Sequence, residues 1–222
     1  VYIKSISGAG THYFGLDGEV CNLNTTTVNT NPYFAATGKI NDTNWYLFIG
    51  VVYPYNTTGH SVGIAGVYNC RTGVKILAGN NYNWGPNATL SNTRAYQYYS
   101  DTGSVSQFVW PCVYLCDGGE PSLDDMLSMA STSARNPITN TNVNTYISDD
   151  AIITSKLLVT GRGKAINEDP GCIDSSAWVY NVAPFSLVAD ATAPYGTHSM
   201  LCEGQSQNRT LPFSVSEGKT YK

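Results

Sequence analysis

The stretch Trp45-Tyr46-Leu47-Phe48-Ile49-Gly50-Val51-Val52-Tyr53 is apolar or aromatic at nearly every position. A strand with one wet face alternates apolar and polar residues, whereas a strand covered on both faces forms a continuous apolar run. The stretch is also rich in the β-branched and aromatic residues that favour strands. It therefore predicts one central strand of a sandwich over residues 45–53.

Short strand candidates separated by turn residues surround this run. Asn56-Thr57-Thr58-Gly59 and Asp101-Thr102-Gly103 are typical of turns that join consecutive antiparallel strands. Apolar and aromatic residues gather at residues 61–68, 73–77, 94–99, 105–110 and 113–115. The pattern predicts an all-β fold, with a jelly-roll β-sandwich module over residues 1–127.

Few residues carry a charge. Asp, Glu, Lys and Arg make up 13% of the 222 residues, and the chain has 16 Tyr and 21 Gly. The 12 Lys and Arg against 16 Asp and Glu give a net charge of −4. Because no basic cluster is available to neutralise phosphates, we expect no nucleic-acid partner. No run reaches the ~20 apolar residues of a membrane-spanning helix, so we expect no membrane insertion.

Composition divides the chain into three parts. Residues 121–127 predict a short helix, capped by Ser122, that closes the first module. Residues 128–167 predict a polar linker followed by an oligomerising stalk segment, because the apolar residues between 146 and 159 lack obvious cover within the chain. Residues 168–222 contain strand candidates at 178–180, 185–188, 199–203 and 211–215 and predict the opening part of a second β module.

Metal sites and disulfides have weak support in the sequence, and we expect no cofactor. Three single histidines do not match zinc spacing. Acidic residues crowd near residues 17–19, 124–125 and 167–174 without a calcium-loop pattern, which favours solvated turns. Cys112 and Cys116 are too far apart on a strand to bridge each other. The pairing of the six cysteines stays open; they are Cys21, Cys70, Cys112, Cys116, Cys172 and Cys202.

Several segments resemble tail proteins of long-tailed bacteriophages, in particular tail fibres and central tail-tip proteins. Residues 45–50, 94–99 and 113–122, the last with Asp117-Gly118 and Glu120-Pro121-Ser122, look like the end of a fibre jelly-roll module. Residues 142–152 resemble the passage into a trimeric stalk, and the segment from Trp178 onward resembles the first half of a carbohydrate-binding-like jelly roll. The resemblance implies a virion tail location, a homotrimer, contacts with other tail proteins and a structural or adhesive role in host attachment.

Two groups of aromatic residues are candidates for binding host surface glycans. A sugar site needs an aromatic platform with amides and hydroxyls beside it. The competing interpretation is that aromatic residues in β proteins fill cores or pair across strands. The candidate ligand-binding residues are Tyr82, Trp84, Asn87, Arg94, Tyr96 and Tyr98.

Two other functions remain as alternatives. The chain has no nucleophile-elbow, paired-His zinc or phosphate-loop motif, which favours a protein without an enzyme activity. A polysaccharide-cleaving enzyme needs only two carboxylates and stays an alternative. A secreted or cell-surface lectin is the other, because five sequons begin at Asn24, Asn41, Asn56, Asn87 and Asn208.

The order of the modules leads to one further prediction. Residues 168–222 look like the opening half of a sandwich and residues 1–127 like its closing half. Half a sandwich exposes edge strands and an unfinished core. We therefore predict that one half completes the other in a shared sheet, within this chain or between copies, with the segment near residues 211–221 beside a strand of the first module.

Overall fold

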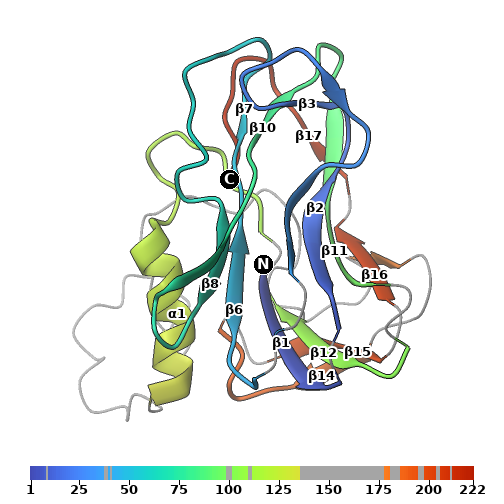
Figure 1. The fold of residues 1–222 in the computed structure, drawn as a ribbon, viewed down its shortest axis with the longest axis vertical. Helices are drawn as coiled ribbons and strands as arrows, with labels where there is room; N and C mark the ends of the chain where they lie inside the picture. The colour runs from blue at the N-terminus through green and yellow to red at the C-terminus, as the bar shows by residue number, and fades with distance from the viewer. Residues whose placement is uncertain are drawn as a thin grey trace, which may run out of the picture.

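The computed structural model describes residues 1–8, 10–37, 40, 42–98, 102–109, 112–135, 178–180, 186–194, 198–203, 206–210 and 212–222. These residues form seventeen strands and one helix, so the prediction of an all-β sandwich is confirmed (Figure 1). The segment 136–177 lies outside the described residues. It includes Cys172, the acidic residues from 167 to 174 and the apolar stretch on which the trimer prediction rests.

Three sheets build the described part of the chain. The seven-stranded sheet has the order β14 (Ser186–Ala189), β15 (His198–Glu203), β12 (Val105–Val109), β1 (Tyr2–Ser7), β6 (Tyr46–Ile49), β8 (Gly66–Asn69) and β9 (Lys75–Ala78). The six-stranded sheet has the order β13 (Trp178–Tyr180), β16 (Ser206–Thr210), β11 (Leu90–Gln97), β2 (His12–Asp17) and β5 (Tyr33–Thr37), with β17 (Phe213–Ser214) also pairing with β11. The four-stranded sheet has the order β4 (Val28–Asn29), β3 (Val20–Asn22), β10 (Tyr82–Trp84) and β7 (Val52–Tyr53).

The main core lies between the facing sheets. Ile3, Phe48 and Phe108 of the seven-stranded sheet belong to the same buried cluster as Phe14 and Leu16 of the six-stranded sheet. Alternating side chains of each strand point to opposite faces, so every second residue of these strands enters the core. Burial of such side chains supplies the main driving force for the fold.

The other face of the seven-stranded sheet is covered by the helix α1 (Leu123–Arg135) (Figure 1). Met126 and Met129 of α1 belong to a second buried cluster with Tyr2, Leu47 and Tyr68 of the sheet. As predicted, Ser122 caps the helix: its hydroxyl accepts from the Asp125 amide at 3.1 Å, and the Asp125 carboxylate accepts from the Ser122 amide at 3.0 Å. The predicted end at Leu127 is wrong. The helix continues to Arg135, into the region predicted as linker.

The apolar run over residues 45–53 forms two strands rather than the single strand predicted. β6 ends at Ile49, and β7 begins at Val52 in a different sheet, parallel to β10. At Gly50 an added Cβ would lie 1.9 Å from the Phe34 ring, and the Val51 amide leaves the ladder to donate to Asn81 Oδ1 at 2.7 Å. The chain therefore crosses between sheets here while both halves stay buried.

The two predicted hairpin turns are also wrong. Residues 56–59 follow β7, which pairs with β10, and precede β8, which pairs with β6. Residues 101–103 separate β11 and β12, which lie in different sheets. Both turns therefore connect sheets. Turn residues predict a change of direction but do not specify which strand pairs next.

The prediction that the C-terminal part shares sheets with the N-terminal part is confirmed within this chain. β15 pairs with β12 over Val105↔Glu203 to Phe108↔Met200, and β16 pairs with β11 over Arg94↔Arg209 to Gln97↔Ser206. Figure 1 shows these C-terminal strands beside β11 and β12. Near the end of the chain, Tyr221 bridges Val52 and Leu115, so the strand predicted at residues 113–115 is reduced to an isolated bridge.

A buried ion pair also joins the C-terminal part to β1. Lys4 Nζ lies 3.0 Å from Asp190 Oδ2, donates to Thr192 Oγ1 at 2.9 Å and sits 4.6 Å from the centre of the Trp45 ring. Burial alone raises the pKa of Asp190, but hydrogen bonds from Thr192 and Lys4 and the Lys4 charge outweigh it and hold that pKa below its ordinary value. The pair therefore favours the ionised carboxylate in the folded state.

This pair should make stability depend on pH. A lowered folded pKa adds stability that is full above the unfolded pKa of about 3.9 and is lost as pH falls through the folded value. We expect Lys4→Met to lower the free energy of unfolding by about 3 kcal/mol at pH 7. The difference from the parent should shrink between about pH 5 and pH 2. Urea unfolding across this range measures it, with the exposed Lys219→Met as the control; a difference that stays constant would contradict the assignment.

Candidate functional site

Four half-buried tyrosines gather on the face of the six-stranded sheet that points away from the core. Tyr13 comes from β2, Tyr33 from β5, Tyr96 from β11, and Tyr98 follows β11 directly. Their positions follow from strand alternation, because neighbouring side chains of a strand point to opposite faces. Phe14 enters the core, so Tyr13 beside it points outward. We call these four side chains the tyrosine platform. Figure 1 shows β2 and β11 side by side, on the side of the molecule opposite α1.

The rings of the platform contact one another closely. Tyr13 and Tyr96 are directly opposed in the ladder, and their rings stack with centres 5.0 Å apart and planes 7° from parallel. The Tyr13 ring also lies 4.9 Å from that of Tyr33 and 5.6 Å from that of Tyr98. The Tyr33 and Tyr96 hydroxyls are hydrogen-bonded to each other. Burial, followed by this bond, raises the pKa of Tyr96 well above its ordinary value, so the phenol stays neutral.

A glycine makes room for this arrangement. At Gly15, opposite Arg94 in the ladder, an added Cβ would lie 2.1 Å from the Pro32 carbonyl oxygen and 2.9 Å from the Tyr33 ring. The β2–β5 pairing also carries an irregularity between Phe14 and Gly15. Any larger residue would therefore push the start of β5, and Tyr33 with it, away from the platform.

Arg94 lies beside the tyrosine platform on β11, the strand that also carries Tyr96. Its guanidinium carbon sits 4.5 Å from the centre of the Tyr33 ring, within the range of a cation–π contact. Its Nη2 donates to the exposed Asn31 Oδ1 at 2.7 Å. The aromatic rings and hydroxyls of the tyrosine platform therefore lie beside the Asn31 amide and the Arg94 cation.

The structure separates the predicted binding residues into two groups. Arg94, Tyr96 and Tyr98 come together as expected. Tyr82 and Trp84 are 5% and 3% exposed and belong to the main core, which contradicts a surface platform at β10. Asn87, which was predicted to lie beside them, is exposed. Its backbone N–H donates to Glu19 Oε1 at 3.4 Å. For Tyr82 and Trp84, the competing interpretation of core packing is correct.

Two platform residues were missed in the sequence. Tyr13 stands between His12 and Phe14 in a strand whose alternate residues are buried, and Tyr33 begins the next strand of the sheet. Alternation marks both as outward-facing. Their convergence with Tyr96 depends on the pairing of β2 with both β5 and β11, which periodicity alone does not provide.

A second surface feature is a polar groove at one end of the sandwich. Residues 24–27 and 56–58, in the loops at the top of Figure 1, enclose about 320 Å³ between amide and hydroxyl side chains. The buried Asn83 fixes both loops, because its Nδ2 donates to the Pro54 and Thr57 carbonyls and its Oδ1 accepts from the Asn24 amide. The groove is held rigidly by the fold, but it offers no aromatic face.

Two of the sequons begin in the loops of this groove, at Asn24 and Asn56. The Asn24 side chain donates to the His60 carbonyl at 2.7 Å and accepts from the His60 amide at 3.0 Å. A glycan on Asn24 would replace one of the two Nδ2 hydrogens, so the bond to the His60 carbonyl would have to use the other. Asn56 and Asn87 are exposed. Among the sequon side chains that the structure describes, these two offer the lectin alternative its most exposed acceptors.

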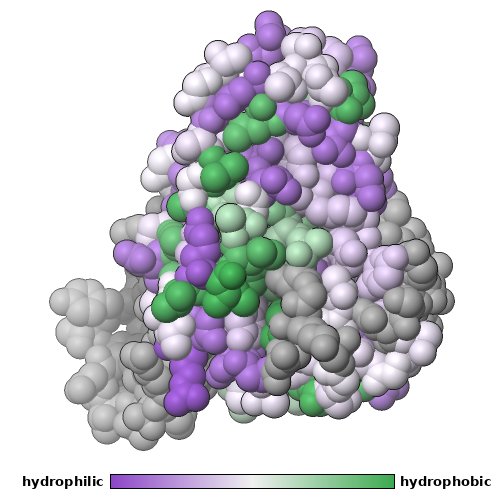
Figure 2. All heavy atoms as spheres, in the orientation of Figure 1, coloured by the Kyte–Doolittle hydropathy of each residue, from purple (hydrophilic) through white to green (hydrophobic). Residues whose placement is uncertain are grey.

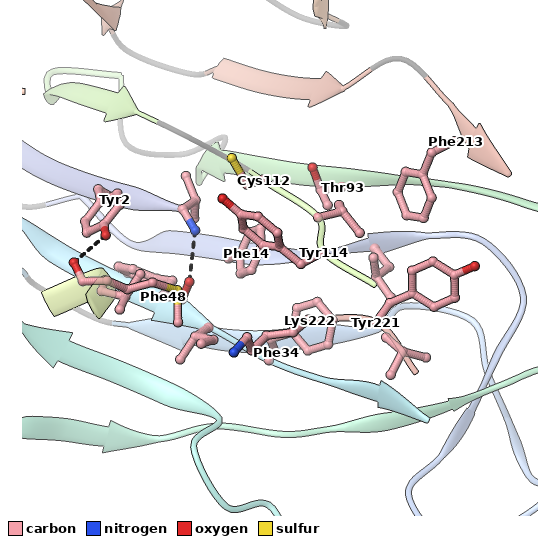
Figure 3. Close-up of a pocket in the computed structure, with 18 of the residues that line it drawn as sticks. Tyr2, Phe14, Phe34, Phe48, Thr93, Cys112, Tyr114, Phe213, Tyr221 and Lys222 are labelled. Carbon is pink, nitrogen blue, oxygen red and sulfur yellow. Dashed lines mark hydrogen bonds between the residues drawn. The ribbon is translucent and has the colours of Figure 1, made fainter. Parts of the chain in front are cut away.

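An interior cavity of about 40 Å³ lies between the sheets. Figure 3 shows the rings of Phe14, Phe34 and Phe48 around it, with Phe213 and Tyr221 at one side. Among its described lining residues there is no carboxylate and no histidine. A space this small holds a few water molecules at most, so we regard it as a packing defect of the core rather than a substrate site.

Acidic and thiol groups do not assemble into a metal centre in the described part of the chain. No group of three or more His, Cys, Asp or Glu residues lies close enough together there to hold a metal ion. At the start of the helix the Asp125 carboxylate accepts a hydrogen bond from the Ser122 hydroxyl, so one member of the acidic pair at residues 124–125 has a role in capping. Cys116 is a free thiol and forms no bridge with Cys112, although the two residues do not lie on the single strand that the predicted distance assumed. Burial raises the pKa of Cys70 to about 12, which keeps that thiol protonated.

The described helix α1 is neither long nor apolar enough to cross a bilayer. Comparisons of the chain with protein-family models, with curated proteins and with solved structures return no match.

Proposed function

We propose that this chain is a non-catalytic recognition module that binds glycans of a host cell surface through the tyrosine platform. The observation that carries the proposal is the convergence of Tyr13, Tyr33, Tyr96 and Tyr98 on one outward face, beside Asn31 and Arg94. Half-buried rings fixed by their neighbours can bind a ligand at little cost in side-chain entropy. The surrounding amide and hydroxyl groups suit the hydroxyls of a sugar.

The surface chemistry supports recognition by stacking and neutral hydrogen bonds. Only 13% of residues are charged. Figure 2 shows that the largest apolar patch on the face drawn lies over the region where Figure 1 places β8 and the hairpin that follows it, with smaller apolar spots above it. Val74, Ile76 and Leu77 of that hairpin are exposed. Apart from this patch, the drawn face is largely polar or neutral in hydropathy.

The proposed setting is the tail of a bacteriophage, as part of a fibre or tail-tip protein in the virion. The support is the resemblance of residues 45–50, 94–99, 113–122 and 142–152 to such proteins. In this setting the chain acts as a homotrimer and contacts other tail proteins.

Light scattering at micromolar concentration tests the trimer, and a clean monomer of the full chain would count against it. Glycan at Asn56 or Asn87 in the native protein would instead favour the lectin alternative.

The proposal is tested by a binding screen of the full chain against a glycan array and against intact bacterial cells. We expect binding to a defined set of surface glycans, with each bound glycan recovered unchanged after incubation. Product analysis separates the alternatives: released oligosaccharide would favour the polysaccharide-cleaving enzyme. Absence of binding to any glycan or cell surface would contradict the proposal.

A further inference from the structure

Arg94 is buried without a matching negative charge. The residue is 8% exposed, and its Nε is buried with no hydrogen-bond partner. Among the described residues the only ion pair joins Lys4 to Asp190, so no carboxylate there neutralises Arg94. Asp17, an acidic residue on the neighbouring strand, is opposed to Asn92 instead. Buried cations are normally paired, and a buried N–H group without a partner calls for an explanation.

The strand register makes this charge more unusual. Arg94 of β11 is directly opposed to Arg209 of β16 in the antiparallel ladder. Like charges at directly opposed positions destabilise a sheet. The register therefore places a second arginine opposite Arg94 on the neighbouring strand.

The geometry around Arg94 suits a planar anion. One face of the guanidinium lies on the Tyr33 ring, and Nη2 is fixed by Asn31. The bond to Asn31 uses one of the five guanidinium N–H donors, and the planar fork of an arginine matches the two oxygens of a carboxylate. The stacked Tyr13 and Tyr96 rings stand next to this position, where a sugar ring would lie.

We propose that the tyrosine platform selects acidic sugars, with the ring stacked on the tyrosines and the sugar carboxylate bound by Arg94. This inference rests on the proposed function and adds the class of glycan to it. A uronic acid differs from its neutral parent sugar only by oxidation at C6, so the two present almost the same ring to the tyrosines. The part of the difference in affinity that is lost on replacing Arg94 reports the Arg94 contact.

The test compares oligosaccharides of glucose and galactose with their uronate counterparts, using calorimetry on the full chain. We expect the parent protein to bind a uronate oligosaccharide roughly 10- to 100-fold more tightly than its neutral counterpart, the range for a hydrogen bond to a charged group. Arg94→Gln should remove this preference, so that the variant binds a uronate oligosaccharide and its neutral counterpart with the same affinity. Arg94→Lys should keep only part of it, because an ammonium group lacks the planar fork.

The matched control is Arg71→Gln, an exposed arginine between β8 and β9, which should keep the full preference. Thermal unfolding of each variant confirms that the sandwich is intact. Equal affinity for neutral and acidic partners, or an unchanged preference in Arg94→Gln, would overturn the inference and leave the proposed function standing. A parent protein that binds neither series, nor any glycan in the screen, fails the proposed function and the inference with it.

Discussion

We expect Tyr221→Ala to lower the free energy of unfolding by about 3–5 kcal/mol, the usual cost of removing a buried aromatic ring. The Tyr221 side chain is 5% exposed, and its ring lies edge-on to Trp84 with centres 5.6 Å apart. Its backbone exchanges two hydrogen bonds with Val52, at 2.8 and 2.9 Å. The residue thus holds the C-terminal segment inside the core built by the N-terminal part.

Urea unfolding followed by tryptophan fluorescence measures this effect. Tyr221→Phe keeps the ring and loses only the acceptor for the Ser216 amide, so it should cost about 1 kcal/mol. Tyr55→Ala is the surface control, because Tyr55 is 41% exposed; we expect a change within about 0.5 kcal/mol. If Tyr221→Ala were as stable as Tyr55→Ala, the last residues would not belong to the core.

The second large effect concerns binding. We expect the double variant Tyr13→Ala/Tyr96→Ala to weaken binding of any glycan found in the screen by about 2 kcal/mol or more, or roughly 30-fold in Kd. These two rings form the parallel stack at the centre of the tyrosine platform, so their loss removes the aromatic contacts proposed for the sugar. Circular dichroism should show the strand content of the parent.

The controls separate loss of the platform from a general effect. Tyr96→Phe removes the hydroxyl bonded to Tyr33 but keeps the ring, and it should retain most of the affinity. Tyr55→Ala removes an exposed tyrosine that follows β7, away from the platform strands, and should bind as the parent does. Full affinity in the double variant would show that glycans bind elsewhere, with the polar groove as the next candidate.

Strand-forming segments were largely predictable from the sequence, whereas their partners were not. The apolar residues around Phe48 correctly indicated burial on both faces, because β6 packs on the main core and under α1. The break after Ile49 depends on the contact of Gly50 with Phe34, a residue of β5. Such a contact is set by tertiary packing, which a local pattern does not contain.

The candidate site shows the same division. Tyr82, Trp84 and Tyr96 look alike in sequence, since each is an aromatic residue next to an Asn or Gln. Tyr96 is half-buried on the face of the six-stranded sheet that no described sheet covers, whereas Tyr82 and Trp84 face the main core. The extent of α1 was also missed, because residues 128–135 are rich in Ser, Thr and Ala and read equally well as a linker.

The most direct test of the account is an NMR titration of the protein, with labelled tyrosine rings, against a glycan from the screen. We predict that the ring signals of Tyr13, Tyr33, Tyr96 and Tyr98 shift together and saturate with one Kd. The signals of the buried Tyr82 and Tyr221 should stay in place. Saturable binding that leaves the four platform rings unchanged would contradict the assignment of the recognition surface.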